Sequence, residues 1–191
     1  MNLTKKEVAI RQLNTAIKLF FDDGDAVSIH ALAAASATVL ADLLEQKGQT
    51  SWRKQIVEQY PDHTKAEIFQ ILRNAQNFFK HADQDFDKSL EFSDTDNDAI
   101  IWIATFECGL LIQGKDQKHN EREKLSTPIS VFQLWNIATK PGDFYMPEEI
   151  SAPANALFPG ISERPRSVQL SIGASVLRNR EAYNRRHPPD H

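Results

Sequence analysis

Apolar residues recur along the first 140 residues at the three- and four-residue spacing of an amphipathic α-helix, and this pattern predicts five helices. The clearest stretch is 64–85, where apolar positions gather on one side and polar positions on the other. Capping boxes formed by Thr4 with Glu7 and by Thr64 with Glu67 predict where the first and third helices begin. The five predicted helices cover residues 4–22, 25–47, 64–85, 93–112 and 127–140.

Two of these helices are expected at the centre of a bundle. The 93–112 segment is apolar on nearly every side, so it is predicted to be the most buried helix. Glu107 lies within its apolar run and needs a partner if it is inside. The 25–47 segment has a main apolar stripe and a second face that lets another helix approach closely. That second face comprises His30, Ala34, Ala37 and Ala41.

The pattern changes after residue 140. Prolines recur at every sixth position, and a proline interrupts regular structure because it cannot donate a backbone hydrogen bond. They are Pro141, Pro147, Pro153, Pro159 and Pro165. We predict an extended arm here, with at most a short turn around residues 146–150, packed on the bundle by Phe144, Tyr145 and Phe158, and a last weak helix over 167–186. The predicted fold is therefore all-α, with a bundle of about five helices in residues 1–140 and a Pro-punctuated arm with a basic tail in residues 141–191.

The composition is typical of a soluble protein with one core. The chain has 191 residues, of which 41% are hydrophobic. Its longest apolar run, 99–106, is far shorter than the roughly 20 residues of a membrane span, and its first residues lack a signal-peptide pattern. The single cysteine, Cys108, excludes an intrachain disulfide and a cysteine-rich zinc site. We predict a cytoplasmic protein that does not enter a membrane.

The formal charge of −4 argues against a general nucleic-acid-binding protein, but the charge is unevenly distributed. Residues 1–163 carry −8, whereas residues 164–191 carry +4. The basic tail contains Arg178, Arg180, Arg185 and Arg186. Two targets are open for these arginines: a nucleic acid, or the acidic segment 83–98 of the same chain. Docking on the acidic segment is the interpretation we favour, because it requires no partner.

The candidate site is a polar column on the third predicted helix. Arg73, Asn77 and His81 follow one another at four-residue intervals and therefore lie on one side of a helix. A guanidinium suits a phosphate, and an imidazole titrates near neutral pH, so the set has the groups needed to bind and cleave RNA. The same column is also what the solvated face of a surface helix presents. Further candidate ligand-binding residues are Asn74, Lys80 and His30.

No metal or cofactor is predicted. Asp83, Asp85 and Asp87 alternate as in a calcium loop, but Lys88 and Asp94 occupy the positions where an EF-hand requires glycine and glutamate. A site formed by His30, His81 and a nearby aspartate is a remaining alternative. The motifs of phosphate-binding loops, zinc hydrolases and serine hydrolases are absent from the sequence.

The all-helical pattern, with Arg73-Asn74 followed by Asn77-Phe78-Phe79-Lys80-His81, resembles the HEPN superfamily. That resemblance implies a small, dimeric helical bundle, in many members an RNase whose arginine and histidine form a composite site across the dimer. The family motif has four to six residues between arginine and histidine, whereas seven separate Arg73 from His81 here. In the other register, Gln76 occupies the arginine position.

Two functional hypotheses therefore stand, and whether the protein is an enzyme is left open. The first is a non-catalytic binding or interaction module with RNA, a nucleotide or a protein as partner. The second is a metal-independent RNase that acts through Arg73, Asn77 and His81. A homodimer is predicted as well, because the small face of the 25–47 helix and the polar column exceed what one five-helix core can cover.

Overall fold

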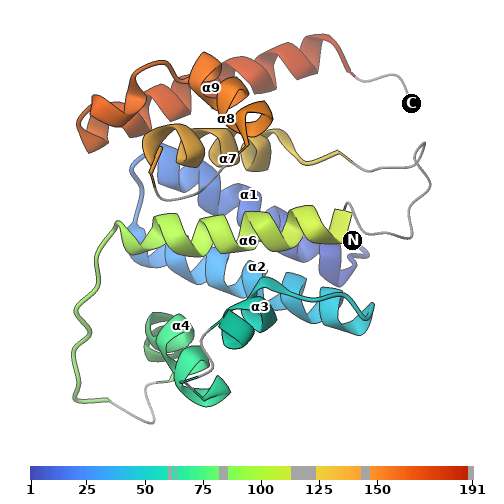
Figure 1. The fold of residues 1–191 in the computed structure, drawn as a ribbon, viewed down its shortest axis with the longest axis vertical. Coiled ribbons are helices and arrows are strands. Elements are labelled where there is room, and N and C mark those ends of the chain that lie inside the picture. The colour runs from blue at the N-terminus through green and yellow to red at the C-terminus, as the bar shows by residue number, and fades with distance from the viewer. Residues whose placement is uncertain (60–61, 63, 82–85, 113–123, 143–146, 189–191) are drawn as a thin grey trace.

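The computed structural model of the chain is helical (Figure 1). It describes the chain except residues 60–61, 63, 82–85, 113–123, 143–146 and 189–191, and except the side chains of residues 59, 65 and 68–72. The described part contains eight α-helices and no strand. They are α1 (Lys5–Phe21), α2 (Ala26–Gln46), α3 (Trp52–Gln59), α4 (Lys65–Lys80), α6 (Asp96–Ile112), α7 (Thr127–Thr139), α8 (Glu148–Leu157) and α9 (Arg166–Arg186), with a 3₁₀ turn, η2 (Ile161–Glu163), before α9.

The predicted all-α bundle is confirmed, and its five helices correspond to α1, α2, α4, α6 and α7. Thr4 and Thr64 cap α1 and α4 as predicted: in each capping box the threonine N–H donates to the glutamate three residues later, at 2.8 and 2.7 Å. Helix α4 ends earlier than predicted, at Lys80, with His81 as its C-cap residue. Residues 49–62 form a polar link between two predicted helices, in which the sequence indicates a short amphipathic turn around Trp52, Ile56 and Val57; the structure has a helix there, α3.

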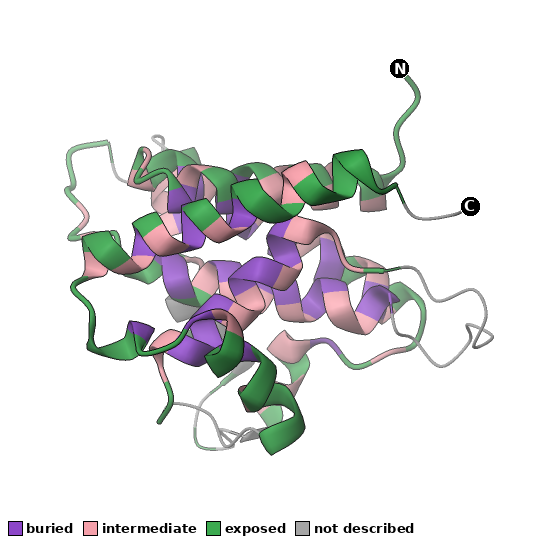
Figure 2. Ribbon diagram, turned by 90° about the horizontal axis from the view of Figure 1, so that it is seen from above, coloured by how far each residue is buried: buried purple, intermediate pink, exposed green. Residues whose placement is uncertain are grey.

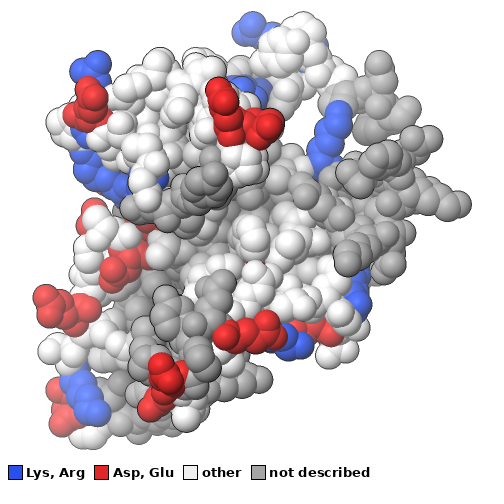
Figure 3. All heavy atoms as spheres, in the orientation of Figure 1, with Lys and Arg blue, Asp and Glu red and all other residues white. Residues whose placement is uncertain are grey.

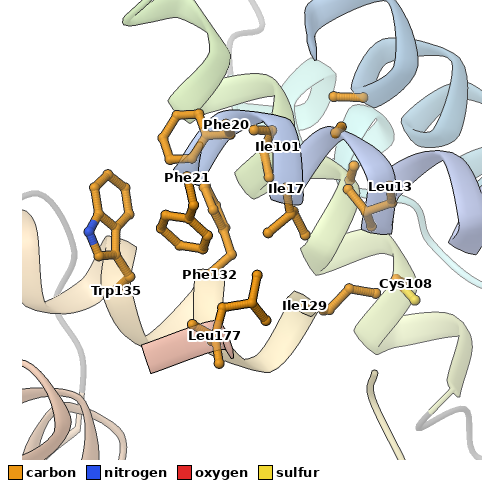
Figure 4. Close-up of a cluster of buried hydrophobic side chains, with 14 of the residues drawn as sticks. Leu13, Ile17, Phe20, Phe21, Ile101, Cys108, Ile129, Phe132, Trp135 and Leu177 are labelled. Carbon is orange, nitrogen blue, oxygen red and sulfur yellow. The ribbon is translucent and has the colours of Figure 1, made fainter. Parts of the chain in front are cut away.

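Helix α2 lies at the centre, packed against α1 and α6. Helix α7 packs on α1 and α6, and α8 and α9 pack on α7, so the chain is layered from α9 at the top of Figure 1 to α4 at the bottom. Buried residues line the facing sides of the central helices, and exposed residues cover their outer sides (Figure 2). The aromatic core lies between α1 and α7, where Phe20, Phe21, Phe132 and Trp135 surround one another (Figure 4).

The central position of α2 also bears on the membrane prediction. By length and composition α2 is apolar enough to cross a membrane, which the sequence analysis did not anticipate, but the core helix of a soluble protein passes the same test. Here α2 is contacted by α1, α4 and α6. The cytoplasmic location stays a prediction.

The C-terminal segment is more regular than predicted. Residues Glu148–Leu157 form α8, which corrects the expected extended course, and α9 is a long helix and not a weak one. Pro153 lies inside α8, where it removes one helical hydrogen bond. The helix forms nevertheless because Ala154 and Phe158 are buried against the bundle and hold it in place.

The docking of α9 depends on a close approach to α1. Gly173 of α9 is buried, and a Cβ atom added there would lie 2.3 and 2.4 Å from two carbons of the Phe21 ring. The ring is held by its edge-on contact with Trp135, at a centroid distance of 5.6 Å. Only glycine therefore fits where α9 crosses α1.

Substitution of this glycine should loosen the docking of α9. We expect Gly173→Ala to destabilise the protein by about 1–3 kcal/mol, because overpacking outweighs the gain in helix propensity of about 1 kcal/mol. Gly109→Ala in α6 is the matched control: an added Cβ there meets nothing within 4 Å, so this variant should be neutral or stabilised. Urea unfolding would measure both. Equal effects of the two substitutions would contradict the close approach of α9 to Phe21.

The basic tail docks differently from our favoured interpretation. Arg178 pairs with Asp22 of the α1 C-cap, at 3.2 Å. The acidic segment is contacted instead at its last residue: Asp98 accepts hydrogen bonds from both Nη atoms of Arg166 and forms an ion pair with Lys140, at 3.0 Å. The other predicted tail residues, Arg180, Arg185 and Arg186, are exposed.

Candidate functional site

The polar column predicted on the third helix is divided between two environments. Arg73 is half-buried and lines a cavity together with Gln76, which is only 5% exposed. Asn77 and His81 are exposed, and His81 lies past the last turn of α4. The remaining candidates on this helix, Asn74 and Lys80, are exposed as well. The structure thus turns Arg73 toward the cavity and leaves the other column residues on the outer surface.

The orientation of α4 explains this division. Phe79 packs edge to face on His30 of α2, with ring centroids 5.7 Å apart, and on Phe92, at 5.4 Å. Residues three apart share a helical face, so docking Phe79 also buries Gln76. Arg73 lies three residues before Gln76 and therefore on the same face of α4, which is turned toward α2. The sequence pattern predicted the helix correctly. It placed Arg73 opposite the buried face of this helix, whereas the structure has Arg73 at that face, half-buried.

His30 is a buried aromatic-cluster residue and not an accessible ligand. It is 6% exposed, and its ring nitrogens have no hydrogen-bond partner among the described residues. Burial lowers the pKa of His30 from its ordinary value, and the Asn97 side chain and the Asp96 carboxylate offset this only in part. The neutral ring is therefore the stable form in this position.

The alternative metal site is not formed by the part of the chain that the structure describes. Within it, no three histidine, cysteine, aspartate or glutamate side chains gather closely enough to hold a metal ion. His30 is buried and His81 is exposed. Asp83 and Asp85, which the calcium-like spacing includes, lie outside the described residues.

A small, solvent-open cavity of about 50 Å³ lies between α2, α3, α4 and α6. The small face predicted on α2 forms one wall, and the other walls carry two guanidinium groups, an amide and a carboxyl group. It is lined by Ala34, Ala37, Thr38, Ala41, Trp52, Arg53, Arg73, Gln76, Ile100, Ile103 and Glu107. A space of this size admits a few waters or one small polar group.

Glu107 is the most unusual group of this cavity. It is 1% exposed on α6, and one of its oxygens, Oε1, accepts a hydrogen bond from the backbone N–H of Trp52 at 3.0 Å. This supplies the partner that the sequence required. The other oxygen, Oε2, has none among the described residues. Burial raises the pKa of Glu107 to about 7, although the N–H groups at the start of α3 and the charge of Arg53 favour the ionised form.

The neighbouring wall is held by an ion cluster. The Arg53 guanidinium is 2.7 Å from both the Asp42 and the Glu45 carboxylates, and Glu45 also accepts a hydrogen bond from the Ser51 hydroxyl. The hydrogen bond from Arg53 is the main cause that lowers the pKa of Glu45 to about 2. Arg53 is therefore committed to these carboxylates and fixes the start of α3 beside Glu107.

The cavity was largely missed by sequence reasoning. The lone glutamate in an apolar run is the one signal in the sequence that points to this cavity. Trp52 and Arg53 lie between two of the predicted helices, and nothing local in the sequence indicates that this segment contacts a residue 55 positions later. Comparison of the chain with protein-family models, with curated proteins and with solved structures found no match. The resemblance to the HEPN superfamily therefore stays a prediction.

Proposed function

We propose that the protein is a non-catalytic binding module whose ligand site is the cavity between α2, α3, α4 and α6. The supporting observation is Glu107, a buried carboxyl group that lines the cavity with one oxygen unpartnered among the described residues. An unsatisfied buried acceptor costs stability, and groups with strongly shifted pKa values gather at functional sites.

The chemistry of the walls indicates the class of ligand. Methyl groups of α2 suit an apolar part of a ligand, while Glu107 accepts a hydrogen bond from a hydroxyl or amide group. Arg53, in the same lining, is already paired with Asp42 and Glu45, so the charge of the walls does not select the charge of the ligand. The ligand group that enters is thus small and carries a hydrogen-bond donor.

Thermal unfolding in the presence of short-chain amides and alcohols tests this proposal. A probe at about 100 times its Kd should stabilise the wild type by about 2.7 kcal/mol. Glu107→Gln, which alters the acceptor, and Ala37→Leu, which fills the cavity, should each abolish that stabilisation. Asn77→Ala, on the outer side of α4, should leave it unchanged. Stabilisation that persists in both cavity variants, or no stabilisation by any probe, would contradict the proposal.

The RNase hypothesis makes a separate prediction. The resemblance requires arginine and histidine to act together, yet Arg73 lines the cavity while His81 is exposed beyond the end of α4. We therefore expect the purified protein to leave total RNA intact. Cleavage by the wild type that is lost in His81→Ala would establish the enzyme and overturn the non-catalytic proposal.

A further inference from the structure

The second distinctive surface lies at the opposite end of the molecule from the cavity, where the end of α9 meets the start of α7 (Figure 1). A solvent-open hollow of about 530 Å³ lies between them. Its walls carry hydroxyl, amide, phenol and guanidinium groups and one apolar side chain. It is lined by Leu125, Thr127, Ser130, Asn179, Arg180, Tyr183 and Asn184.

The hollow has a basic rim within an acidic protein. Arg180 and Arg186 lie on the side of α9 that faces the hollow, because at 100° per residue both fall within a third of a turn of Tyr183. No ion pair of either arginine occurs in the described part of the chain, and both are exposed. On the face drawn in Figure 3, basic and acidic side chains both occur over the upper part of the molecule, and acidic ones are also spread over its lower part.

An aromatic platform stands beside these charges. Tyr183 is 62% exposed, and its ring stacks on His187 with centroids 4.4 Å apart and planes inclined by 22°. The stack leaves part of the phenol ring open to solvent. Across the hollow, the Asn184 amide donates to the Thr127 hydroxyl at 2.8 Å, which joins the two helices.

We propose that this hollow binds single-stranded RNA. A flexible single strand is recognised by a positively charged groove with aromatic rings on which bases stack, and amides and hydroxyls contact base edges and sugars. Arg180 and Arg186 bind phosphates, Tyr183 stacks on a base, and Asn179 and Ser130 contact the base edge or the ribose. An acidic peptide would use the arginines but not the ring, so the exposed platform favours RNA.

Charge alone does not define the site, because the other side of α9 is also basic. Arg185 is exposed in the same last turn but lies on the flank of Arg178, which pairs with Asp22. Glu181, on that flank too, pairs with Lys18 at 2.8 Å. Arg185→Ala therefore matches Arg186→Ala in charge, helix position and effect on the helix dipole, and differs only in the face affected.

The test measures fluorescence anisotropy of a labelled oligouridylate of about 12 nucleotides at several salt concentrations. We expect Tyr183→Leu to weaken binding roughly tenfold. Arg180→Ala and Arg186→Ala should each weaken it and reduce the slope of log K against log salt by about 0.7. Arg185→Ala should change neither quantity, and thermal unfolding would verify that all four variants fold.

Three results would overturn the inference. One is the absence of binding at low salt. Another is equal loss in Arg185→Ala and Arg186→Ala, which would show non-specific attraction only. The third is displacement of the RNA by polyglutamate with no effect of Tyr183→Leu, which would make the hollow an acidic-peptide site. Because the cavity lies elsewhere, Glu107→Gln should leave RNA affinity unchanged, so this inference and the cavity proposal can fail separately.

Discussion

Glu107→Gln is expected to stabilise the protein at pH 8, by up to about 3 kcal/mol, and to have almost no effect at pH 4. Glutamine is nearly isosteric with glutamate, so its carbonyl oxygen can still accept the hydrogen bond that Trp52 donates at 3.0 Å. What it removes is a charge in a buried position. The gain in the free energy of unfolding should therefore vary with pH as Glu107 ionises, because the packing of the side chain is unchanged.

The direction of the pH dependence follows from the raised pKa. Below about pH 4.5 the carboxyl group is protonated in the folded and the unfolded protein, so ionisation contributes nothing to stability. Between pH 4.5 and 7 the unfolded chain loses the proton and the folded protein keeps it, so the wild type loses about 1.4 kcal/mol per pH unit. Above pH 7 both states are ionised and the full cost remains. The Glu107→Gln variant does not lose this stability, because glutamine does not ionise.

Glu45→Gln is the matched control, because Glu45 lies in the adjoining ion cluster and its pKa is lowered, to about 2. Its ionised form is favoured by folding, so this variant should be destabilised by about 1–3 kcal/mol at pH 7, with the difference shrinking as the pH falls below 4.5. Urea unfolding across pH 4–8 would compare the two variants. A Glu107→Gln protein less stable than the wild type at pH 8 would show that the ionised carboxylate is fully compensated.

A stabilising substitution inside the cavity would also bear on function. Natural proteins retain groups that lower stability where activity needs them. The unpartnered carboxyl oxygen of Glu107 is such an arrangement, since an amide could accept the Trp52 hydrogen bond without placing a charge in a buried position. The ligand binding that we propose gives a reason for the presence of this group. The stability measurement and the probe-binding measurement on Glu107→Gln should therefore change in opposite directions.

The features predictable from sequence were those fixed by residues close together in the chain. The capping boxes at Thr4 and Thr64 join atoms three residues apart, so the starts of α1 and α4 could be predicted from local sequence. The helical bundle could also be predicted, because the apolar stripe of each helix must be buried against another helix. The α8 helix was missed because Pro153 locally disfavours it; the packing of the aromatic residues of this segment on the bundle was predicted, and Phe158 is buried, but the sequence did not show that this packing would hold a helix together.

The candidate site depended on distant partners and was therefore predicted only in part. The need of Glu107 for a partner followed from its apolar surroundings, but Trp52 could not be identified. Arg73 was a candidate because of its chemistry, and the structure places it beside Gln76 and the α2 wall and not beside Asn77 and His81. The contact between Phe79 and His30 decides which side of α4 is inside, and no periodicity encodes it.

Asp98→Asn is expected to be the most destabilising of the substitutions considered, costing about 3–5 kcal/mol. Asp98 is buried at the start of α6 and accepts from Arg166 and Lys140. The Arg166 guanidinium also lies over the rings of Phe20 and Trp135, at 5.0 and 5.2 Å, so it cannot simply turn into water. Removing the charge of Asp98 leaves two cations facing each other without their common counter-charge.

Arg178, which lies on α9 like Arg166, forms an exposed ion pair that provides the comparison. Asp22→Asn removes the partner of Arg178, where the two side chains are 63% and 65% exposed, and should cost only about 0–1 kcal/mol. The double variant Asp98→Leu with Arg166→Met should recover most of the loss, because it removes both desolvated charges and keeps the apolar contact with Phe20. Urea unfolding of the three variants decides the matter. If Asp98→Asn costs no more than Asp22→Asn, the buried cluster does not hold α9 to the bundle, and the close fit of Gly173 against Phe21 is what docks it.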